Sequence, residues 1–319
     1  MDSRTKRRLT AAELDALARR ALGLGVWSAQ ELTDGFANAV WRLVLSDGST
    51  VVLKVAPPPE LEQLSYERNL LRMEAAALEL AGAAGMPVPE LLVAGFDDPV
   101  IGGDYLVLDA LDGTPWNQAE IQDVGPIRRE VGRHLAAMHA VTGEVYGYPH
   151  AGITGRTWRE AYLAMAGALL DDTLRYPTPL PRPAEEIRAV LEAASPVLDE
   201  VDTPCLVHFD VWPGNVFLDL SGPPRVQAVI DHERAFWGDP LADLITPTIF
   251  GEVEQDDPLL AGYREVRPLE LSAARLDLYR AYLYLILLVE NGPRQYPEED
   301  YARLRDLATT GLTKALDQL

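Results

Sequence analysis

The sequence predicts an α+β protein in two parts, a small antiparallel sheet near the N-terminus and a mainly helical remainder. Three short runs of β-branched and aromatic residues lie within residues 27–55, and Asp47-Gly48 separates the last two, as in a hairpin. A second hairpin is predicted near residues 216–230. Beyond residue 241 the apolar residues recur with helical spacing.

The composition is that of a globular protein with an excess of acid. The 319 residues are 48% hydrophobic and 24% charged, and the net charge is −21. Such acidity argues against a nucleic-acid partner, because phosphate backbones are bound by clustered lysine and arginine. The longest apolar run, residues 281–289, is too short to cross a bilayer, so no membrane partner is expected. The single cysteine, Cys205, and an N-terminus without a signal-peptide core favour a cytoplasmic location.

Local signals predict the N-terminal elements. Residues 9–22 have an amphipathic helical pattern, with Thr10 as the expected N-cap. Strands are predicted over residues 27–32, 40–45 and 50–55.

Lys54 stands out within the third of these strands. The chain has only three lysines, and this one lies in the apolar run 51–55. A buried ammonium group is costly unless it meets negative charge. The phosphates of a nucleotide, together with a glutamate on a helix, would meet that need. The alternative is a lysine that extends to solvent from an edge strand.

Two glutamates on the next predicted helix are candidate partners for Lys54. Residues 61–83 are predicted to form one helix, with leucines, Glu67 and Glu74 at helical spacing. Either glutamate could pair with Lys54, and the alternative for both is a solvated glutamate in a surface ion pair.

The remaining elements are mainly helices. Residues 105–113 form an apolar strand that runs into a turn. Acidic loops lie at residues 252–257 and 298–300, and a cleft with one sign of charge concentrates ligands of the other sign. These loops therefore predict a cationic or amine-bearing ligand. Helices are predicted over residues 127–141, 158–170, 241–250, 264–267, 273–290 and 298–319.

Three oxygen-bearing side chains are predicted to converge at one end of the second hairpin. Asp210 precedes its first strand, Asn215 opens that strand, and Asp231 closes the second strand. One carboxylate and one amide oxygen suit Mg²⁺, which takes hard oxygen ligands. A carboxylate outside the metal shell can orient an acceptor hydroxyl and accept its proton. The spacing matches that of kinases, whereas turn-capping roles account for one such residue but not for three in this order.

The same segment carries a family resemblance. The chain resembles the aminoglycoside phosphotransferase and choline kinase superfamily in the pattern His208-x-Asp210-x-x-x-Gly214-Asn215 followed by Ile230-Asp231. Phe209 stands where that family usually has glycine, and Trp212 where it usually has a small residue or histidine. The resemblance covers about residues 32–243, and it implies a two-lobed protein-kinase-like fold.

The resemblance also implies roles on the nucleotide side. Gly35 and Asn38 would lie in the loop that covers the nucleotide phosphates. Glu74 rather than Glu67 would brace Lys54, which would hold the α- and β-phosphates.

The hinge between the lobes follows the strand at residues 105–113. The resemblance implies that the Asp109 carbonyl and the Leu111 amide hold adenine there. The expected division is then a nucleotide-binding lobe over residues 1–110 and a catalytic, acceptor-binding lobe over residues 111–319.

The predicted function is an ATP- or GTP-dependent, Mg²⁺-dependent phosphotransferase acting on a hydroxyl of a small molecule. Asp210 would be the catalytic base, and Asn215 and Asp231 the metal ligands. An aminoglycoside or related antibiotic is the first expected acceptor, and the alternative is a metabolite such as an amino sugar, a fructosamine or a choline-like compound.

Two other classes of protein stay open at this point. A metallohydrolase could use a cluster of histidine and aspartate, but it leaves Lys54 and Asn215 without a role. A nucleotide-binding pseudokinase usually lacks a catalytic residue, and none is missing here. The metallohydrolase cluster would consist of His208, Asp210, Asp231 and His232.

Overall fold

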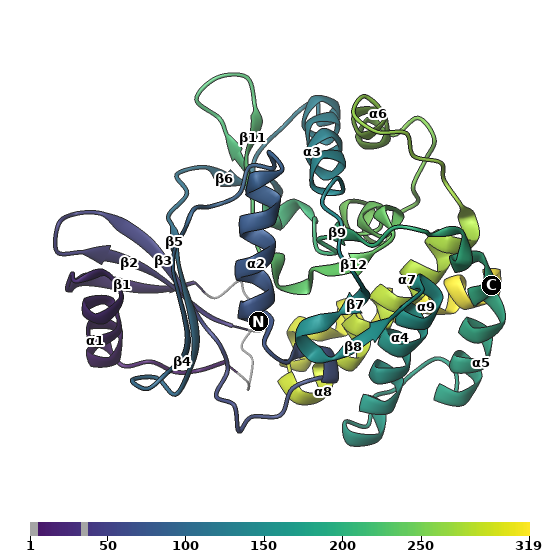
Figure 1. Cartoon of the computed structure of the whole chain (residues 1–319), viewed down its shortest axis with the longest axis horizontal. Helices are drawn as coiled ribbons and strands as arrows, with labels where there is room; N and C mark the ends of the chain where they lie inside the picture. The colour runs from purple at the N-terminus through teal and green to yellow at the C-terminus, as the bar shows by residue number, and fades with distance from the viewer. Residues whose placement is uncertain (1–5, 33–37) are drawn as a thin grey trace.

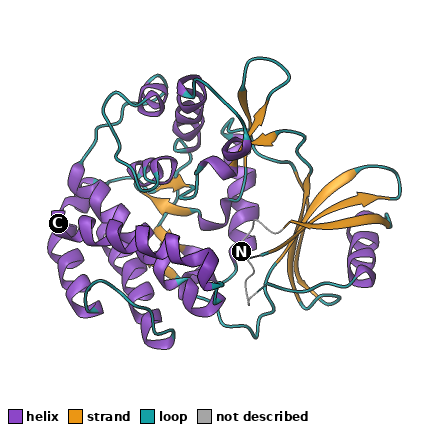
Figure 2. Ribbon diagram, turned by 180° about the vertical axis from the view of Figure 1, so that it is seen from behind, coloured by secondary structure: helices purple, strands orange, loops and turns teal. Residues whose placement is uncertain are grey.

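A five-stranded antiparallel sheet forms the N-terminal part of the protein, and most helices lie in the larger C-terminal part (Figures 1 and 2). The computed structural model describes residues 6–32 and 38–319. The strand order is β1-β2-β3-β5-β4. These strands are β1 (Val26–Leu32), β2 (Ala39–Leu45), β3 (Thr50–Val55), β4 (Leu91–Asp98) and β5 (Gly103–Asp109). The predicted α+β class is confirmed.

The central strand β3 sends its side chains alternately to two covered faces of the sheet. Leu53 packs in the cluster that contains helix α1 (Ala11–Leu22), whereas Val52 packs in the cluster of α2 (Leu70–Ala83). Because side chains alternate along a strand, Lys54 points to the same side as Val52. Lys54 therefore faces α2 from a central strand, which excludes the edge-strand alternative.

The segment before α2 departs from the single helix predicted over residues 61–83. A short 3₁₀ turn, η1 (Ser65–Glu67), is separated from α2 by Asn69, whose φ of 60° lies in the left-handed region that asparagine tolerates. This segment is attached to the helical part of the protein at three places. Asp172 accepts hydrogen bonds from the amide and hydroxyl of Ser65, Glu67 pairs with Arg294, and Asn69 donates to the His150 carbonyl.

Two small sheets hold residues 208–235, which carry Asp210, Asn215 and Asp231 and are called the catalytic segment. The predicted second hairpin is confirmed as β10 (Val216–Asp219) and β11 (Arg225–Val229), and β10 also pairs with β6 (Thr114–Pro115). Strands β9 (Cys205–Val207) and β12 (Phe236–Gly238) pair with each other. They belong to the sheet β8-β7-β12-β9, with β7 (Tyr146–Tyr148) and β8 (Ile153–Gly155). The two flanks of the catalytic segment are thus held side by side.

We propose that the division between the two lobes falls after residue 110. Strand β5 of the first sheet ends at Asp109, and the next strand, β6, pairs with β10 in a different sheet. The chain therefore passes from one sheet to the other between residues 110 and 113.

The C-terminal part is built on α7, which is buried on nearly all sides. The helices predicted over residues 273–290 and 298–319 are confirmed as α7 and α9. In the N-terminal part, Thr10 caps α1 as predicted, because its hydroxyl accepts a hydrogen bond from the Glu13 amide. None of the helices in residues 6–32 and 38–319 has the length and apolar character needed to cross a membrane. The helices of this part are α3 (Gly125–Met138), α4 (Trp158–Arg175), α5 (Ala184–Ala194), α6 (Pro258–Arg264), α7 (Ala273–Val289), α8 (Asn291–Arg294) and α9 (Glu298–Gln318).

Two helix predictions near residue 250 are wrong. Residues 241–250 form the 3₁₀ turns η7 (Pro240–Leu244) and η8 (Thr246–Thr248). No helix begins at residue 264, because α6 (Pro258–Arg264) ends at that residue. The prolines explain the first error, since Pro247 has no amide hydrogen to continue an α-helix.

Phe209 has a left-handed backbone conformation although it is not a glycine. Its φ is 60°, its side chain is fully buried, and its ring centroid lies 5.2 Å from that of Phe236 and 5.6 Å from that of Tyr282. The resemblance places glycine here because glycine adopts this φ without strain. In this chain the packing of the ring offsets the strain.

We expect Phe209→Gly to lower the free energy of unfolding by about 2 kcal/mol, because losing a buried ring costs about 3–5 kcal/mol and relieving the backbone returns about 1–2 kcal/mol. Urea unfolding measures the change. Phe250→Gly is the matched control, since Phe250 has a φ of 63° but is only half-buried, and its net effect should be close to zero. An unchanged or raised stability in Phe209→Gly would contradict the explanation.

Candidate active site

The loop that carries Asp210 is fixed by a buried carboxylate beneath it. Asp243 accepts the backbone amides of His208 at 2.8 Å and of Phe209 at 2.5 Å. The same carboxylate lies 2.8 Å from His139 Nε2, and Asp243 and His139 are fully buried. Asp243 therefore holds the loop without contributing to the open side of the site.

Asp210 and Asn215 are in direct contact. Asn215 Nδ2 donates to the Asp210 carbonyl at 2.9 Å and to Asp210 Oδ2 at 3.2 Å. The Asn215 carbonyl accepts the amide of Ile230 at 2.9 Å, which brings Asp231 to the same end of the hairpin. Gly214 lies in the turn between Asp210 and Asn215. A Cβ there would lie 2.1 Å from the Trp212 ring, so a larger residue would force that ring to move.

Lys54 joins the sheet to the catalytic segment. Its Nζ lies 2.5 Å from Glu74 Oε1 and 2.7 Å from Asp231 Oδ1. Burial alone would lower the pKa of Lys54, but Asp231 and Glu74 together raise it above its usual value. Burial likewise opposes ionisation of Asp231, yet the Lys54 charge holds the pKa of Asp231 below its usual value. Glu67 pairs with Arg294 instead, so the partner of Lys54 is Glu74.

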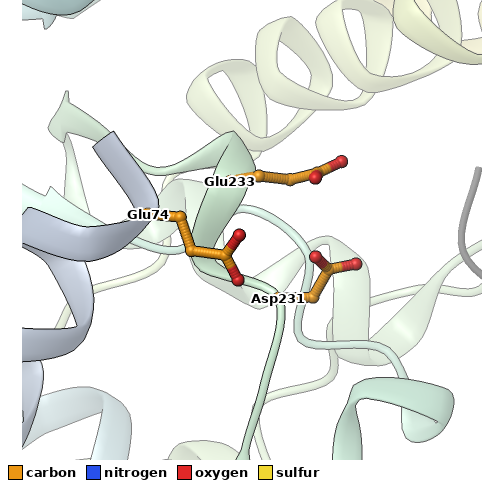
Figure 3. Close-up of side chains that lie close together, drawn as sticks. All are labelled: Glu74, Asp231 and Glu233. Atoms are coloured by element: carbon orange, nitrogen blue, oxygen red, sulfur yellow. The ribbon is translucent and has the colours of Figure 1, made fainter. Parts of the chain in front are cut away.

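Glu233 is a member of the site that the sequence analysis did not assign. Glu74, Asp231 and Glu233 offer carboxylate oxygens that all lie within 4.8 Å of one another, at the junction of α2 and η6 (His232–Arg234) (Figure 3). Burial and the charge of Asp231 raise the pKa of Glu233 well above its usual value. The signal available in the sequence was the second acid two residues after Asp231.

The phosphate-loop prediction is covered only in part by the structure. Gly35 lies outside the described residues. Asn38 is buried, and its Nδ2 donates to Glu233 Oε2 at 2.6 Å. Asn38 therefore links the end of that loop to the cluster of carboxylates.

The two residues predicted for adenine lie at the junction of the lobes. Asp109 is the last residue of β5, and its amide donates to the Glu90 carbonyl at 2.9 Å. Leu111 follows in the loop toward β6, with its carbonyl facing the guanidinium of Arg42. Their contact with a nucleotide stays a prediction.

Asp210 is in a low-dielectric environment beside Arg234. Burial raises the pKa of Asp210 to about 6, Arg234 opposes the rise, and Asp231 adds to it. The Asp210 side chain is 18% exposed, so one face stays accessible to a substrate. A carboxyl group with this pKa can take up a proton near neutral pH.

The histidines of this segment do not form the metal site of a hydrolase. His208 Nδ1 accepts the Asp210 amide at 3.1 Å, and His208 Nε2 lies 3.0 Å from the Ile230 carbonyl. Both ring nitrogens are therefore occupied by backbone groups. His232 is fully buried, packs against His208 at a centroid distance of 4.2 Å, and burial lowers its pKa well below the usual value.

Lys54 pairs with Glu74 and Asp231 beside the contact between Asp210 and Asn215, and this arrangement agrees with the comparison to protein families. The model of the phosphotransferase enzyme family matches residues 28–275. The chain belongs to this family. Membership of this family argues against a metallohydrolase.

Two curated proteins are similar to the chain over part of their own length. Acyl-CoA dehydrogenase family member 11 of Gallus gallus is 27% identical over 239 residues, which cover 71% of this chain and 28% of that protein. The chloroplastic protein-ribulosamine 3-kinase of Arabidopsis thaliana is 25% identical over 204 residues, 58% of this chain and 56% of that protein. The chain thus spans between about a quarter and just over half the length of these curated relatives.

A solved structure shows the fold. A thermostable mutant of aminoglycoside phosphotransferase APH(4)-Ia, in a ternary complex with AMP-PNP and hygromycin B, has a TM-score of 0.61 and 20% sequence identity. The match covers 96% of this chain and 98% of that chain. The two-lobed kinase-like fold predicted for the chain is confirmed.

Proposed function

We propose that the protein transfers the terminal phosphoryl group of ATP or GTP to a hydroxyl group of a small molecule. The observation that carries this proposal is the convergence of Lys54, Glu74 and Asp231 beside the Asp210–Asn215 pair. Phosphoryl transfer depends mainly on positioning and charge neutralisation, and these side chains supply both.

The donor set fits a magnesium ion. Glu74 Oε2 is buried and has no hydrogen-bond partner among the described residues, and the neighbouring ligand atoms are all oxygens. Asn215 and Asp231 would hold the ion, with Glu233 as a further oxygen donor. A bound Mg²⁺ would neutralise charge on the nucleotide phosphates.

Each remaining residue has a role that its surroundings allow. Asp210 orients the acceptor hydroxyl and accepts its proton, because its carboxylate is accessible on one side. Lys54, braced by Glu74, binds the α- and β-phosphates. Asn38 would help to cover the phosphates. Adenine is held by the carbonyl of Asp109 and the amide of Leu111.

A phosphorylation screen tests the proposed activity directly. The purified protein is incubated with Mg²⁺, ATP or GTP, and panels of aminoglycosides, ribulosamines, fructosamines, amino sugars and choline-like compounds. We expect acceptor-dependent release of nucleoside diphosphate and a phosphate ester in ³¹P NMR spectra. Asp210→Asn is the matched control for contaminating kinases, and no ester from any hydroxyl compound would argue against the function.

We propose a cationic acceptor, with an aminoglycoside as the first class to test. A cavity of about 600 Å³ next to Pro213 in the catalytic loop is lined by four acidic residues. Two of them are already paired, Glu252 with Arg280 and Asp257 with Arg128. The other two, Glu254 and Asp256, form no ion pair within the described part of the chain.

The unpaired acids lead to a prediction about acceptor affinity. Replacing Glu254 with Gln and Asp256 with Asn together should raise KM about threefold with little change in kcat, because exposed charges contribute modestly and equally to both states. The wild-type KM should rise with ionic strength, since salt screens the attraction. Asp257 is left intact because it accepts the Leu259 amide and holds Arg128. A KM indifferent to salt would contradict a cationic acceptor.

A second acceptor class, a sugar–amine adduct, is favoured by the ribulosamine kinase relative. The same screen separates the two classes, because kcat/KM ranks their members on one scale.

Glu233 is expected to tune the requirement for metal. Glu233→Gln should raise the Mg²⁺ concentration for half-maximal activity about tenfold, because a bound Mg²⁺ would hold Glu233 ionised, whereas glutamine keeps the shape but offers only a neutral oxygen. Titrating Mg²⁺ at saturating nucleotide measures the shift. Glu130→Gln, a substitution of the same kind on α3, is the control. Equal Mg²⁺ curves for wild type and Glu233→Gln would exclude Glu233 from the metal site.

A further inference from the structure

A row of alternating charges leads away from Asp210. Arg234 Nη1 lies 3.7 Å from Asp210 Oδ1, and Arg234 Nη2 lies 2.9 Å from Glu290 Oε2. The same Glu290 oxygen accepts a 2.8 Å hydrogen bond from Arg294 Nη1. Arg294 Nη2 lies 2.5 Å from Glu67 Oε1. We call Glu67, Arg294, Glu290 and Arg234 the charge row.

Every member of the charge row is removed from water. The exposed fractions of the side chains are 8% for Arg234, 3% for Glu290, 2% for Arg294 and 6% for Glu67. Charges in such an environment are weakly screened, so each one strongly constrains its neighbours. A change in the charge or position of one member therefore alters the electrostatic balance of the member beside it.

The distances show which carboxylate holds Arg234. The 2.9 Å contact with Glu290 is a charge-assisted hydrogen bond, whereas 3.7 Å to Asp210 is too long for one. Glu290 therefore keeps the guanidinium away from the carboxylate that has to accept a proton. A direct Arg234–Asp210 hydrogen bond would hold Asp210 in a fixed orientation and would have to break before Asp210 could engage an acceptor.

The far end of the row lies in the segment before α2. Arg294 also donates to Tyr296 at 2.8 Å, and Glu67 accepts the Leu64 amide at 2.9 Å through its other oxygen. Both partners fix the orientation of the outer pair. Since Arg294 and Arg234 share a single oxygen of Glu290, the strength of one bond affects the other.

We propose that the charge row is a positioning device for the catalytic base, in which Glu290 is the positioning residue that holds Arg234 off Asp210. This rests on the proposed role of Asp210. Among the described residues, no hydrogen bond or ion pair joins the charge row to Lys54, Glu74 or Asp231, so we expect its effect to fall mainly on acceptor activation.

The test is to neutralise Glu290 without changing its shape. In Glu290→Gln, Arg234 is expected to turn to Asp210, and a crystal structure should show the Nη–Oδ distance shortened to about 2.9 Å, the length of a direct hydrogen bond. kcat should fall about tenfold or more, because that bond has to break in each turnover, while KM for the nucleotide stays the same. The double variant Glu290→Gln/Arg234→Gln should regain most of the lost kcat, because it has no guanidinium at residue 234 to bond to Asp210.

Two further variants separate positioning from general stability. Asp172→Asn removes another buried attachment of the same segment, and it should lower Tm but leave kcat unchanged. If Glu290→Gln does not fold, Glu67→Gln is used instead. Arg294 then loses its Glu67 partner and binds Glu290 more strongly, which weakens the bond between Glu290 and Arg234. The same changes should follow on a smaller scale. An unchanged Arg234–Asp210 distance, or a double variant as slow as Glu290→Gln, would overturn the proposal. The distance is measured without any acceptor, so a protein that phosphorylates nothing would refute the proposed function but not the positioning.

Discussion

Asp210→Asn is expected to lower kcat at least about a hundredfold, the usual contribution of a general base, while nucleotide affinity stays within a few fold of wild type. The fold should survive, because the loop around Asp210 is held by Asp243 and not by the Asp210 carboxylate. The carbonyl of residue 210 still accepts the Asn215 amide in the variant. Steady-state kinetics with the acceptor found by the screen, together with calorimetry of nucleotide binding, measure the two quantities.

The matched control for this substitution is Asp219→Asn. Asp219 lies on the same hairpin and pairs with Arg225 at 2.7 Å, so the change removes an aspartate without touching the site. Turnover of Asp210→Asn within a few fold of Asp219→Asn would remove Asp210 from the mechanism.

Asp231→Ala is expected to abolish Mg²⁺-dependent nucleotide binding, because it removes the one carboxylate predicted to share the ion with the amide of Asn215. Lys54 would then retain only Glu74 as a partner. Asn215→Ala should have the milder effect of raising the Mg²⁺ requirement. Titration calorimetry with nucleotide, in the presence and absence of Mg²⁺, measures both.

The backbone at residue 231 requires a second variant. Its φ of 67° lies in the left-handed region, where alanine is strained and asparagine is tolerated. Asp231→Asn therefore tests the loss of charge without backbone strain, and it too should lose Mg²⁺-dependent binding. Unchanged affinity for the Mg²⁺–nucleotide complex in both variants would refute the metal assignment.

Much of the site could be predicted because its signals are local in the sequence. A hairpin with an acid before it, an amide at its start and an acid at its end places Asp210, Asn215 and Asp231 together in any fold that keeps the hairpin. A lone lysine in an apolar strand had to meet negative charge. The residues alone left Glu67 and Glu74 equal, and only the resemblance chose between them.

What the sequence could not supply depends on contacts between distant segments. The break at Asn69 follows from attachments of residues 65–69 to the helical part, and no local pattern shows them. Glu290 contacts Arg234 across 56 residues, and Arg294 contacts Glu67 across 227. Glu233 was missed for a different reason, since its value as an oxygen donor appears only once α2 brings Glu74 beside it.

The attachments of residues 65–69 tie α2 to the C-terminal part of the molecule. Ser65, Glu67 and Asn69 fasten the start of the helix to the C-terminal part, and η6 packs along it further on. The same helix is also joined to the sheet, because Arg72 pairs with Asp97 of β4 and Asp104 of β5. The Lys54–Glu74 pair joins β3 to this doubly attached helix, so a pair of spectroscopic labels on β3 and α2 would report whether nucleotide binding changes their separation in solution.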